Sequence, residues 1–154
     1  MYLLDSNILV YAVNKSAPFH TTAFKILEKI ISNKIKGCLA LQNLSEFFSI
    51  ITNKKRVEHP ISSKEAISEI QKYINTTTLL KISFTPSAMN LFCKLTTKHH
   101  IQGQKIYDLQ LVATMLDNEI KNIITANDSD FKKYEEINTI NPFNKNFDIS
   151  KLEN

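Results

Sequence analysis

The sequence predicts an α/β fold in which helices cover both faces of a short central parallel sheet, a three-layer α/β/α sandwich. Short apolar runs alternate along the chain with longer segments whose apolar residues recur at helical spacing. The runs are apolar throughout, which is typical of parallel strands covered by helices on each side. At 154 residues, the chain is expected to form one domain over residues 1–147, with 148–154 as a loose tail.

Five strands are expected where short apolar runs are bounded by polar residues. The first run stops at Asp5, Ser6 and Asn7. The expected strands cover residues 2–4, 38–41, 79–82, 122–125 and 137–140. Because helical segments separate most successive strands, the strands are expected to run parallel.

Helices are expected between these strands, from the spacing of their apolar residues. They comprise a helical turn at 8–13 and helices at 18–36, 44–51, 62–75, 85–99 and 106–118. Ser62 and Glu65 fit a capping box, and Thr85 with Pro86 fits a helix start. The polar segments 54–60 and 100–105 are expected to be loops.

The composition narrows the function classes. With only 2 glycines, the chain is an unsuitable candidate for a dinucleotide site or a P-loop, which need glycines beside the phosphates. The net charge of +4 suits a polyanionic partner. A lysine-rich surface that binds no such partner would explain the charge equally well. Arg56 is the single arginine, so contacts to a phosphate backbone are expected more than base reading.

The cysteines and the N-terminal residues predict a cytoplasmic protein. Cys38 and Cys93 match no zinc spacing and form no disulfide framework, so they are expected to be buried free thiols in a reducing compartment. The apolar N-terminus lacks a basic leader and contains Asp5, unlike a signal peptide. No apolar run reaches the roughly 20 residues of a membrane span.

Acidic residues from four distant segments are expected at one edge of the sheet. Asp5 follows the first strand, Glu46 follows the second, and Asp108 lies near the start of the helix before the fourth. Asp128 and Asp130 lie in the turn after the fourth strand. In open parallel sheets, ligands bind beyond the carboxyl ends of the strands, where these side chains would converge.

Each acidic residue also has a purely structural explanation. Asp5 fits a helix cap, and Asp108 fits a first-turn aspartate that the helix dipole favours. Glu46 fits a solvated helix residue, and Asp128 and Asp130 fit Asx turns. Carboxylates gathered in apolar surroundings repel one another, however, and need cations or protons. Oxygen ligands without histidine or cysteine favour Mg²⁺ or Mn²⁺ over zinc.

Three stretches together resemble a known family, the PIN-domain ribonucleases, and within it the VapC-like toxins of toxin–antitoxin pairs. They are YLLDSNILVYA, LQNLSEFFSIITNKK and IYDLQLVATMLDNEIKNIITANDSDFKKYEEINTINPF. The resemblance extends over residues 2–143, nearly the whole chain. No single motif is decisive, but their order and spacing are fairly specific. The resemblance implies a PIN-like fold.

The resemblance also implies roles for individual residues. Asp5, Glu46 and Asp108 are the implied catalytic and metal-site carboxylates. Supporting roles fall to the residues beside Asp5 and to those after the fourth strand, namely Ser6, Asn7, Thr125 and Asn127. Many family members carry an aspartate two residues after the threonine, where this chain has Asn127. Asp128 is the first substitute for that carboxylate, and Asp130 the second.

The implied activity is metal-dependent endoribonuclease cleavage of RNA phosphodiesters by activated water, with Mg²⁺ or Mn²⁺ as cofactor. The implied partners are RNA, a second copy of the chain and a small antitoxin protein. Basic residues expected to guide RNA are Lys54, Lys55, Arg56 and Lys105. Their alternative explanation is a solvated polar loop.

The sequence is also compatible with another function, and it argues against two more. The main alternative is a PIN-like module that binds RNA or protein and is catalytically weak or inactive. Asn127 favours this alternative, because it stands where many family members have a carboxylate. A phosphoacceptor domain would need a paired acidic dipeptide after the first strand, where Asp5 stands alone. A phosphatase of the DxD type would need an aspartate in place of Asn7.

Overall fold

The computed structural model describes residues 1–153, which form five strands, seven α-helices and two short 3-10 helices. The strands are β1 (Tyr2–Leu4), β2 (Gly37–Ala40), β3 (Leu79–Ile82), β4 (Asn122–Ile124) and β5 (Asn138–Ile140). The α-helices are α1 (Ser6–Val13), α2 (His20–Ile31), α3 (Leu41–Ile51), α4 (Ser63–Asn75), α5 (Pro86–Lys98), α6 (Ile106–Asp117) and α7 (Asp128–Phe131). The 3-10 helices are η1 (Gly103–Lys105) and η2 (Ile149–Leu152).

The sheet is parallel throughout, with the strand order β3-β2-β1-β4-β5. Leu3 in the central strand β1 lies opposite Cys38 in β2 and Ile123 in β4. The chain moves outward from β1 to β3 and then returns to place β4 on the other side of β1. The strand order therefore reverses between β1 and β4, and ligands of open α/β sheets bind at such a point.

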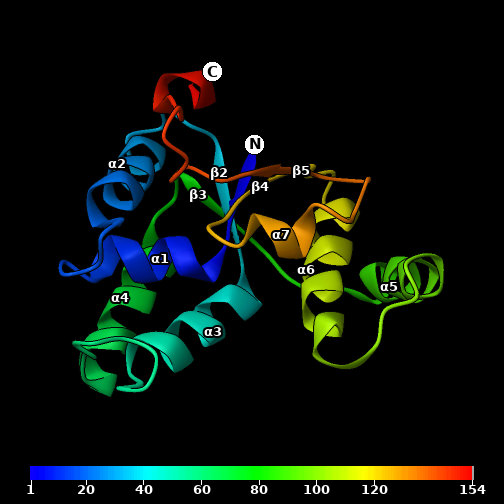
Figure 1. Cartoon of the computed structure of the whole chain (residues 1–154), viewed down its shortest axis with the longest axis horizontal. Helices are drawn as coiled ribbons and strands as arrows, with labels where there is room; N and C mark the ends of the chain where they lie inside the picture. Colours follow the sequence, from blue (N-terminus) through cyan, green and yellow to red (C-terminus); the bar gives the residue numbers. More distant parts are fainter. Residues whose placement is uncertain (154) are drawn as a thin grey trace.

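Helices cover the two faces of the sheet, which confirms the predicted α/β fold. Leu3 and Leu4 are adjacent in β1, so their side chains point to opposite faces. Leu4 joins a core formed with α1 to α4, and Leu3 joins a core formed mainly with α6. Figure 1 shows α1, α2 and α4 on one side of the sheet and α5 and α6 on the other. Within residues 1–153, no helix has the length and apolarity to cross a bilayer.

Most predicted elements agree with the structure to within a residue or two, since strongly apolar runs define them. The predicted capping box is present: Glu65 Oε2 accepts from the Ser62 N–H at 2.8 Å, and Ser62 Oγ accepts from the Glu65 N–H at 3.3 Å. Helix α7 was not expected, because its polar residues favour a turn. The 3-10 helix η1 occupies the end of the predicted loop at 100–105.

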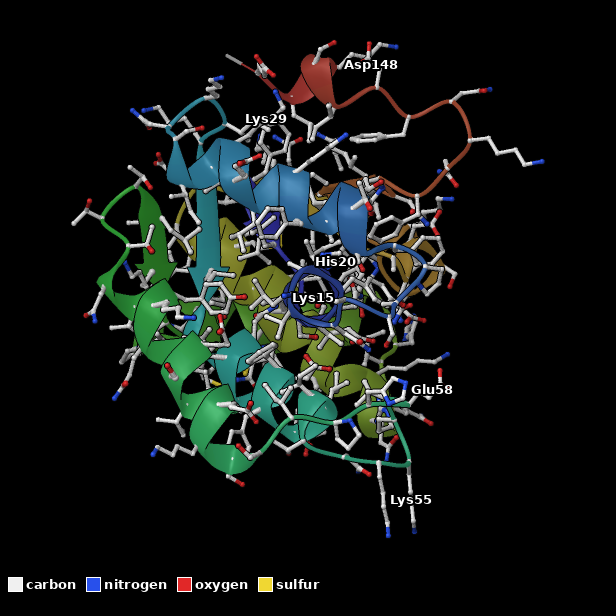
Figure 2. All side chains as sticks on the ribbon, turned by 90° about the vertical axis from the view of Figure 1, so that its left-hand side faces the viewer. Lys15, His20, Lys29, Lys55, Glu58 and Asp148 are labelled. Atoms are coloured by element: carbon white, nitrogen blue, oxygen red, sulfur yellow. The ribbon has the colours of Figure 1, made fainter. Side chains whose placement is uncertain are left out.

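Further sequence predictions differ from the structure. The helix predicted at 18–36 is α2, which begins at His20 and ends at Ile31. Cys93 is exposed, because α5 turns Ala88 and Leu95 toward the core and Cys93 away from it. Residues 149–152, expected to be part of a loose tail, form η2, which lies against α2 (Figure 2). Leu152 is only 4% exposed, and Glu153 pairs with Lys29. Apolar residues late in the chain thus complete the core on the α2 side.

Candidate active site

Asp5 stands where the strand order reverses, directly after β1. Its backbone N–H donates to the carbonyl oxygen of Ile124, the last residue of β4, at 3.0 Å. This pairing of β1 with β4 brings Asp5 beside Thr125. The side chain of Asp5 also caps α1 through the Ser6 N–H, so the capping role and a place in a site are compatible. Asp5 is only 6% exposed, which makes an ionised carboxylate costly unless it is well hydrogen-bonded.

Four hydrogen-bond donors orient the Asp5 carboxylate. Oδ1 accepts from the Ser6 N–H at 2.7 Å and from the Ser6 hydroxyl at 3.4 Å. Oδ2 accepts from the Asn7 side-chain amide at 2.7 Å and from the Thr125 hydroxyl at 2.6 Å. The Asn7 amide oxygen in turn accepts from the Ala126 N–H at 3.0 Å, which ties the turn after β4 to α1. The expected supporting residues Ser6, Asn7 and Thr125 therefore all contact Asp5 or its neighbours.

The protonation equilibrium of Asp5 reflects both its burial and its partners. Burial raises the pKa of Asp5 from 3.8 to about 6, and the negative charge of Glu46 adds to the rise. Hydrogen bonds from Thr125 and Ser6 lower the pKa of Asp5 and so offset part of this rise. A raised pKa on a buried carboxylate is typical of functional sites, and a bound cation would reverse it.

Glu46 reaches the same region from α3. Leu44, Phe47 and Ile51 bury one face of this helix, so the opposite face is exposed. Glu46 lies on the exposed face, and Gln42, one turn earlier, lies near it because residues four apart share a side of a helix. The Gln110 amide of α6 donates to the Gln42 amide oxygen at 3.2 Å and so links the helices that carry Glu46 and Asp108.

Asp108 lies in the first turn of α6. Burial raises the pKa of Asp108 above its usual range, and the charges of Asp130 and Glu46 add to the rise. The positive charges of Lys133 and Lys105 lower the pKa of Asp108. Glu46 and Asp130 thus lie close enough to Asp108 for their charges to raise its pKa. Together with Asp5, these three carboxylates are called the acidic cluster below.

The two aspartates of α7 have different surroundings. Asp128 Oδ1 accepts from the Asn141 amide at 3.2 Å, and Asp128 also pairs with Lys132. Asp130 lies on the other side of this short helix and faces Asp108. The difference follows from helical geometry, since residues two apart point about 200° apart around the axis. The structure thus places Asp130, the second substitute for the fourth carboxylate, in the acidic cluster, and places Asp128 outside it.

A cavity of about 810 Å³ unites these residues. Helices α1, α3, α6 and α7 supply much of its lining. Figure 1 shows these helices around the carboxyl ends of β1 and β4. The lining includes five carboxylates, Asp5, Glu46, Glu58, Asp108 and Asp130, together with Asn7 and Asn127. The lining residues, all drawn from the described part of the chain, include no histidine and no cysteine. The polar donors are therefore hard oxygen and amide groups.

These donors fit a divalent cation that keeps part of its water shell. Among residues 1–153, no three carboxylate, imidazole or thiolate side chains stand close enough together to enclose an ion by themselves. Mg²⁺ commonly binds through one or two carboxylates and retains several waters, so a closed ligand set is not required. A cation would also relieve the repulsion between the carboxylates of this site, by which Glu46 raises the pKa of Asp5, and Asp130 and Glu46 raise that of Asp108.

The expected RNA-contacting residues are distributed unequally. Arg56 lines the cavity, together with its neighbours Val57 and Glu58. Lys54 and Lys55 do not line it, and Figure 2 shows Lys55 pointing away from the body of the molecule. Lys105 is exposed just before α6 and acts on the pKa of Asp108.

Sequence reasoning missed three cavity neighbours. Lys133 lowers the pKa of Asp108, and Tyr107 precedes Asp108 and lines the cavity. Gln42, also in the lining, accepts a hydrogen bond from Gln110. Spacing in the sequence gave no signal for Lys133 or Gln42. Tyr107 carried a weak signal, because a tyrosine before the first-turn aspartate of an apolar helix falls outside the buried stripe.

The chain is similar to proteins of known class. The model of the PIN domain matches residues 2–137. The protein named Ribonuclease VapC48 from Mycobacterium tuberculosis is 22% identical over 139 residues, 90% of this chain and 95% of that protein.

Solved structures share the fold of this chain. VapBC2 from Rickettsia felis, bound to a DNA fragment from its promoter, matches with a TM-score of 0.66 and 21% identity, over 91% of this chain and 97% of that one. A toxin–antitoxin complex from Klebsiella pneumoniae matches with a TM-score of 0.60 and 17% identity, over 93% and 98%. These likenesses bear on the fold, and the family model covers most of the sequence. The chain belongs to the PIN domain family.

Proposed function

We propose that this protein is a divalent-metal-dependent endoribonuclease that uses Mg²⁺ or Mn²⁺. The observation that carries the proposal is the placing of Asp5, Glu46, Asp108 and Asp130 around one cavity of a PIN domain. The ribonuclease name of the Mycobacterium tuberculosis relative supports the choice of RNA as substrate.

Asp5 and Asp108 are the proposed principal metal ligands, with Glu46 and Asp130 completing the acidic cluster. These residues would hold a divalent ion, whose Lewis acidity would activate water and offset negative charge on the phosphate. Thr125, Asn7 and Ser6 keep the Asp5 carboxylate in one orientation through their hydrogen bonds. Asn127 lies at the cavity lining and offers a neutral amide where a further carboxylate would add repulsion.

Glu46 is suited to a second task, which is to orient the attacking water. It is exposed on α3, while Asp5 is buried and held by four donors. A carboxylate that is free to move can accept a hydrogen bond from a water and take its proton. Attack by water on phosphorus leaves a 5′ phosphate and a 3′ hydroxyl, and it does not use the ribose 2′-hydroxyl.

Cationic side chains around the cavity are the proposed contacts to the RNA backbone. Arg56 is best placed, since it lines the cavity and its guanidinium can bind a phosphate through two donors. Lys105 and Lys133 lie near Asp108, whose pKa they affect. Lys54 and Lys55, outside the cavity, are suited to longer-range attraction of the polyanion.

We further propose that the protein is the toxin of a toxin–antitoxin pair, inhibited by a small antitoxin, and that it forms a homodimer. The Klebsiella pneumoniae structure, a toxin–antitoxin complex of the same fold, supports the first part. Exposed apolar side chains at the β3 edge support an interface there: Ile67 and Ile74 on α4, Leu80 on β3 and Met89 on α5. The free cysteines fit a reducing compartment, so a cytoplasmic location completes the proposal.

Cleavage of a labelled RNA mixture by the purified protein tests the proposed function. The reactions contain Mg²⁺, Mn²⁺ or EDTA, and the variants Asp5→Asn and Asp108→Asn are assayed beside the wild type. The proposal expects cutting that requires metal and is lost in both variants. Cutting that survives EDTA or either substitution contradicts it, and a wild type that binds RNA without cutting favours a binding module.

A further inference from the structure

Tyr107 has the largest exposed fraction among the exposed large apolar side chains of the described residues, at 67%. It lies in the first turn of α6, immediately before Asp108, and both residues line the cavity. The apolar side of α6 faces the core through Leu109 and Val112, which leaves Tyr107 on the open side. An aromatic ring held in water beside an acidic cluster needs an explanation other than packing.

Tyr11, the second tyrosine of the cavity lining, has such an explanation. Its ring packs edge-on against Phe19 and Phe143, with centroid distances of 5.4 Å to each. Tyr107 takes part in no comparable ring pair within residues 1–153. Tyr11 is therefore a structural ring, whereas the face of Tyr107 is free for a ligand.

The cavity is larger than a metal site requires. Its volume of about 810 Å³ falls in the range of pockets that hold organic ligands. Consecutive helical residues are about 100° apart around the axis, so Asp108 faces the acidic centre while Tyr107 flanks the opening. A flat group adjoining a phosphate at the centre would meet the tyrosine ring.

The charges around this ring, taken together with the ring itself, favour a nucleic-acid strand over an acidic or apolar peptide. Lys105 lies two residues earlier and Lys133 lies near Asp108. Arg56, on the loop after α3, also lines the cavity. Cations that track a backbone, combined with an exposed aromatic ring, are the usual elements of single-stranded nucleic-acid binding.

We propose that Tyr107 is a substrate-binding residue that stacks on a nucleobase next to the scissile phosphate of a single-stranded RNA. This inference rests on the proposed function and adds a role for Tyr107. The base that stacks on Tyr107 must be unpaired, since a base inside a duplex has no free face. Every base can stack on an aromatic ring, so Tyr107 would select unpaired RNA and position it in the cavity, and it would discriminate little between base sequences.

Binding of two short fluorescent strands tests the inference. One strand is oligouridine, and the other is a sugar–phosphate strand of equal length without bases. Dissociation constants are measured with Mg²⁺ present, in the Glu46→Gln background, which is expected to slow cleavage while keeping the principal ligands Asp5 and Asp108. The variants Tyr107→Ala and Tyr107→Phe are compared with Phe24→Ala, which removes another exposed ring that lies outside the cavity.

Tyr107→Ala is expected to weaken oligouridine binding by about fivefold or more, the lower end of a base–aromatic stack. Tyr107→Phe and Phe24→Ala should stay within about twofold of the parent, since a phenyl ring at position 107 still stacks and Phe24 is remote. The base-free strand should bind all four proteins about equally.

Equal losses on both strands would overturn the inference, because Tyr107 would then act on the backbone or the fold. Unchanged oligouridine binding by Tyr107→Ala would also overturn it and leave a protein partner as the occupant of this face. Since the readout is binding, an absence of RNA cleavage by the wild type contradicts the proposed function without altering this result.

Discussion

The hydroxyl of Thr125 donates a 2.6 Å hydrogen bond to Oδ2 of Asp5, although 120 residues separate them in the sequence. The contact exists because β4 pairs with β1 at the point where the strand order reverses. It opposes the effect of burial on the Asp5 carboxyl group, whose pKa is nevertheless raised to about 6. One hydroxyl thus helps to keep the buried carboxylate ionised near neutral pH.

Thr125→Val is expected to move the acidic limb of the pH–rate profile upward. Loss of a hydrogen bond to a charged group removes about 1.5–3 kcal/mol of stabilisation, so the pKa of Asp5 rises by about one to two units. The protonated form then persists to higher pH, and kcat/KM falls most on the acidic side. Thr125→Ser keeps the hydroxyl and should leave the limb in place. A uniform fall in rate with no shift would contradict this role.

Asp5→Asn should abolish RNA cleavage and yet stabilise the metal-free protein at neutral pH. The folded-state pKa of Asp5 lies above 3.8, so the folded protein binds more protons than the unfolded chain between pH 4 and 6. Stability therefore falls as pH rises through that window, by up to about 3 kcal/mol. An uncharged asparagine removes this penalty.

Urea unfolding in EDTA measures the effect. Asp5→Asn is predicted to raise the midpoint at pH 7.5 and to lose the decline in stability that the wild type shows between about pH 4 and 6. Added Mg²⁺ should stabilise the wild type and leave the variant almost unchanged, since a ligand stabilises only the state that binds it. A variant less stable than the wild type at neutral pH would show that the Asp5 carboxylate is not destabilising.

Asp130→Asn should weaken Mn²⁺ binding by at least about tenfold, whereas Asp128→Asn should have little effect. Only Asp130 lies in the cavity, where its charge acts on Asp108. Asp128 is occupied with Lys132 and Asn141. The substitutions are chemically identical and two residues apart, so each controls for the other. The opposite ranking would place the fourth carboxylate at Asp128.

Arg56→Ala should raise KM for RNA by about two- to fivefold and leave kcat nearly unchanged, because an exposed charge contributes about 1 kcal/mol or less to binding. Lys55→Ala, on the same loop but outside the cavity, should affect KM less while still reducing the salt dependence of binding. Steady-state kinetics at two salt concentrations separate the effects. Equal increases in KM in the two variants would contradict a direct contact between Arg56 and the RNA in the cavity.

The strands could be predicted from the sequence because each is a short apolar run with clear ends. Their pairing could not, since which strand lies beside β1 depends on long-range packing. The expectation that Asp5, Glu46 and Asp108 gather at one edge nevertheless needed only the rule that parallel strands end together. The structure places these three residues around one cavity.

Side-chain direction was the harder part of the site. Whether Asp128 or Asp130 faces the cavity depends on the helical turn that begins at Asp128, and a polar DSDF segment predicts a turn as readily as a helix. The position of Arg56 likewise depends on how the loop after α3 folds back. Local sequence carries no information on either point.

Titration calorimetry with Mn²⁺ tests most directly the central claim that these carboxylates form one cation site. The wild type is compared with Asp108→Asn, with Asp128→Asn as the control of equal charge change outside the cavity. We predict binding by the wild type and the control, and a loss of at least about tenfold in Asp108→Asn. Equal affinity in all three proteins, or no binding by the wild type, would contradict the claim.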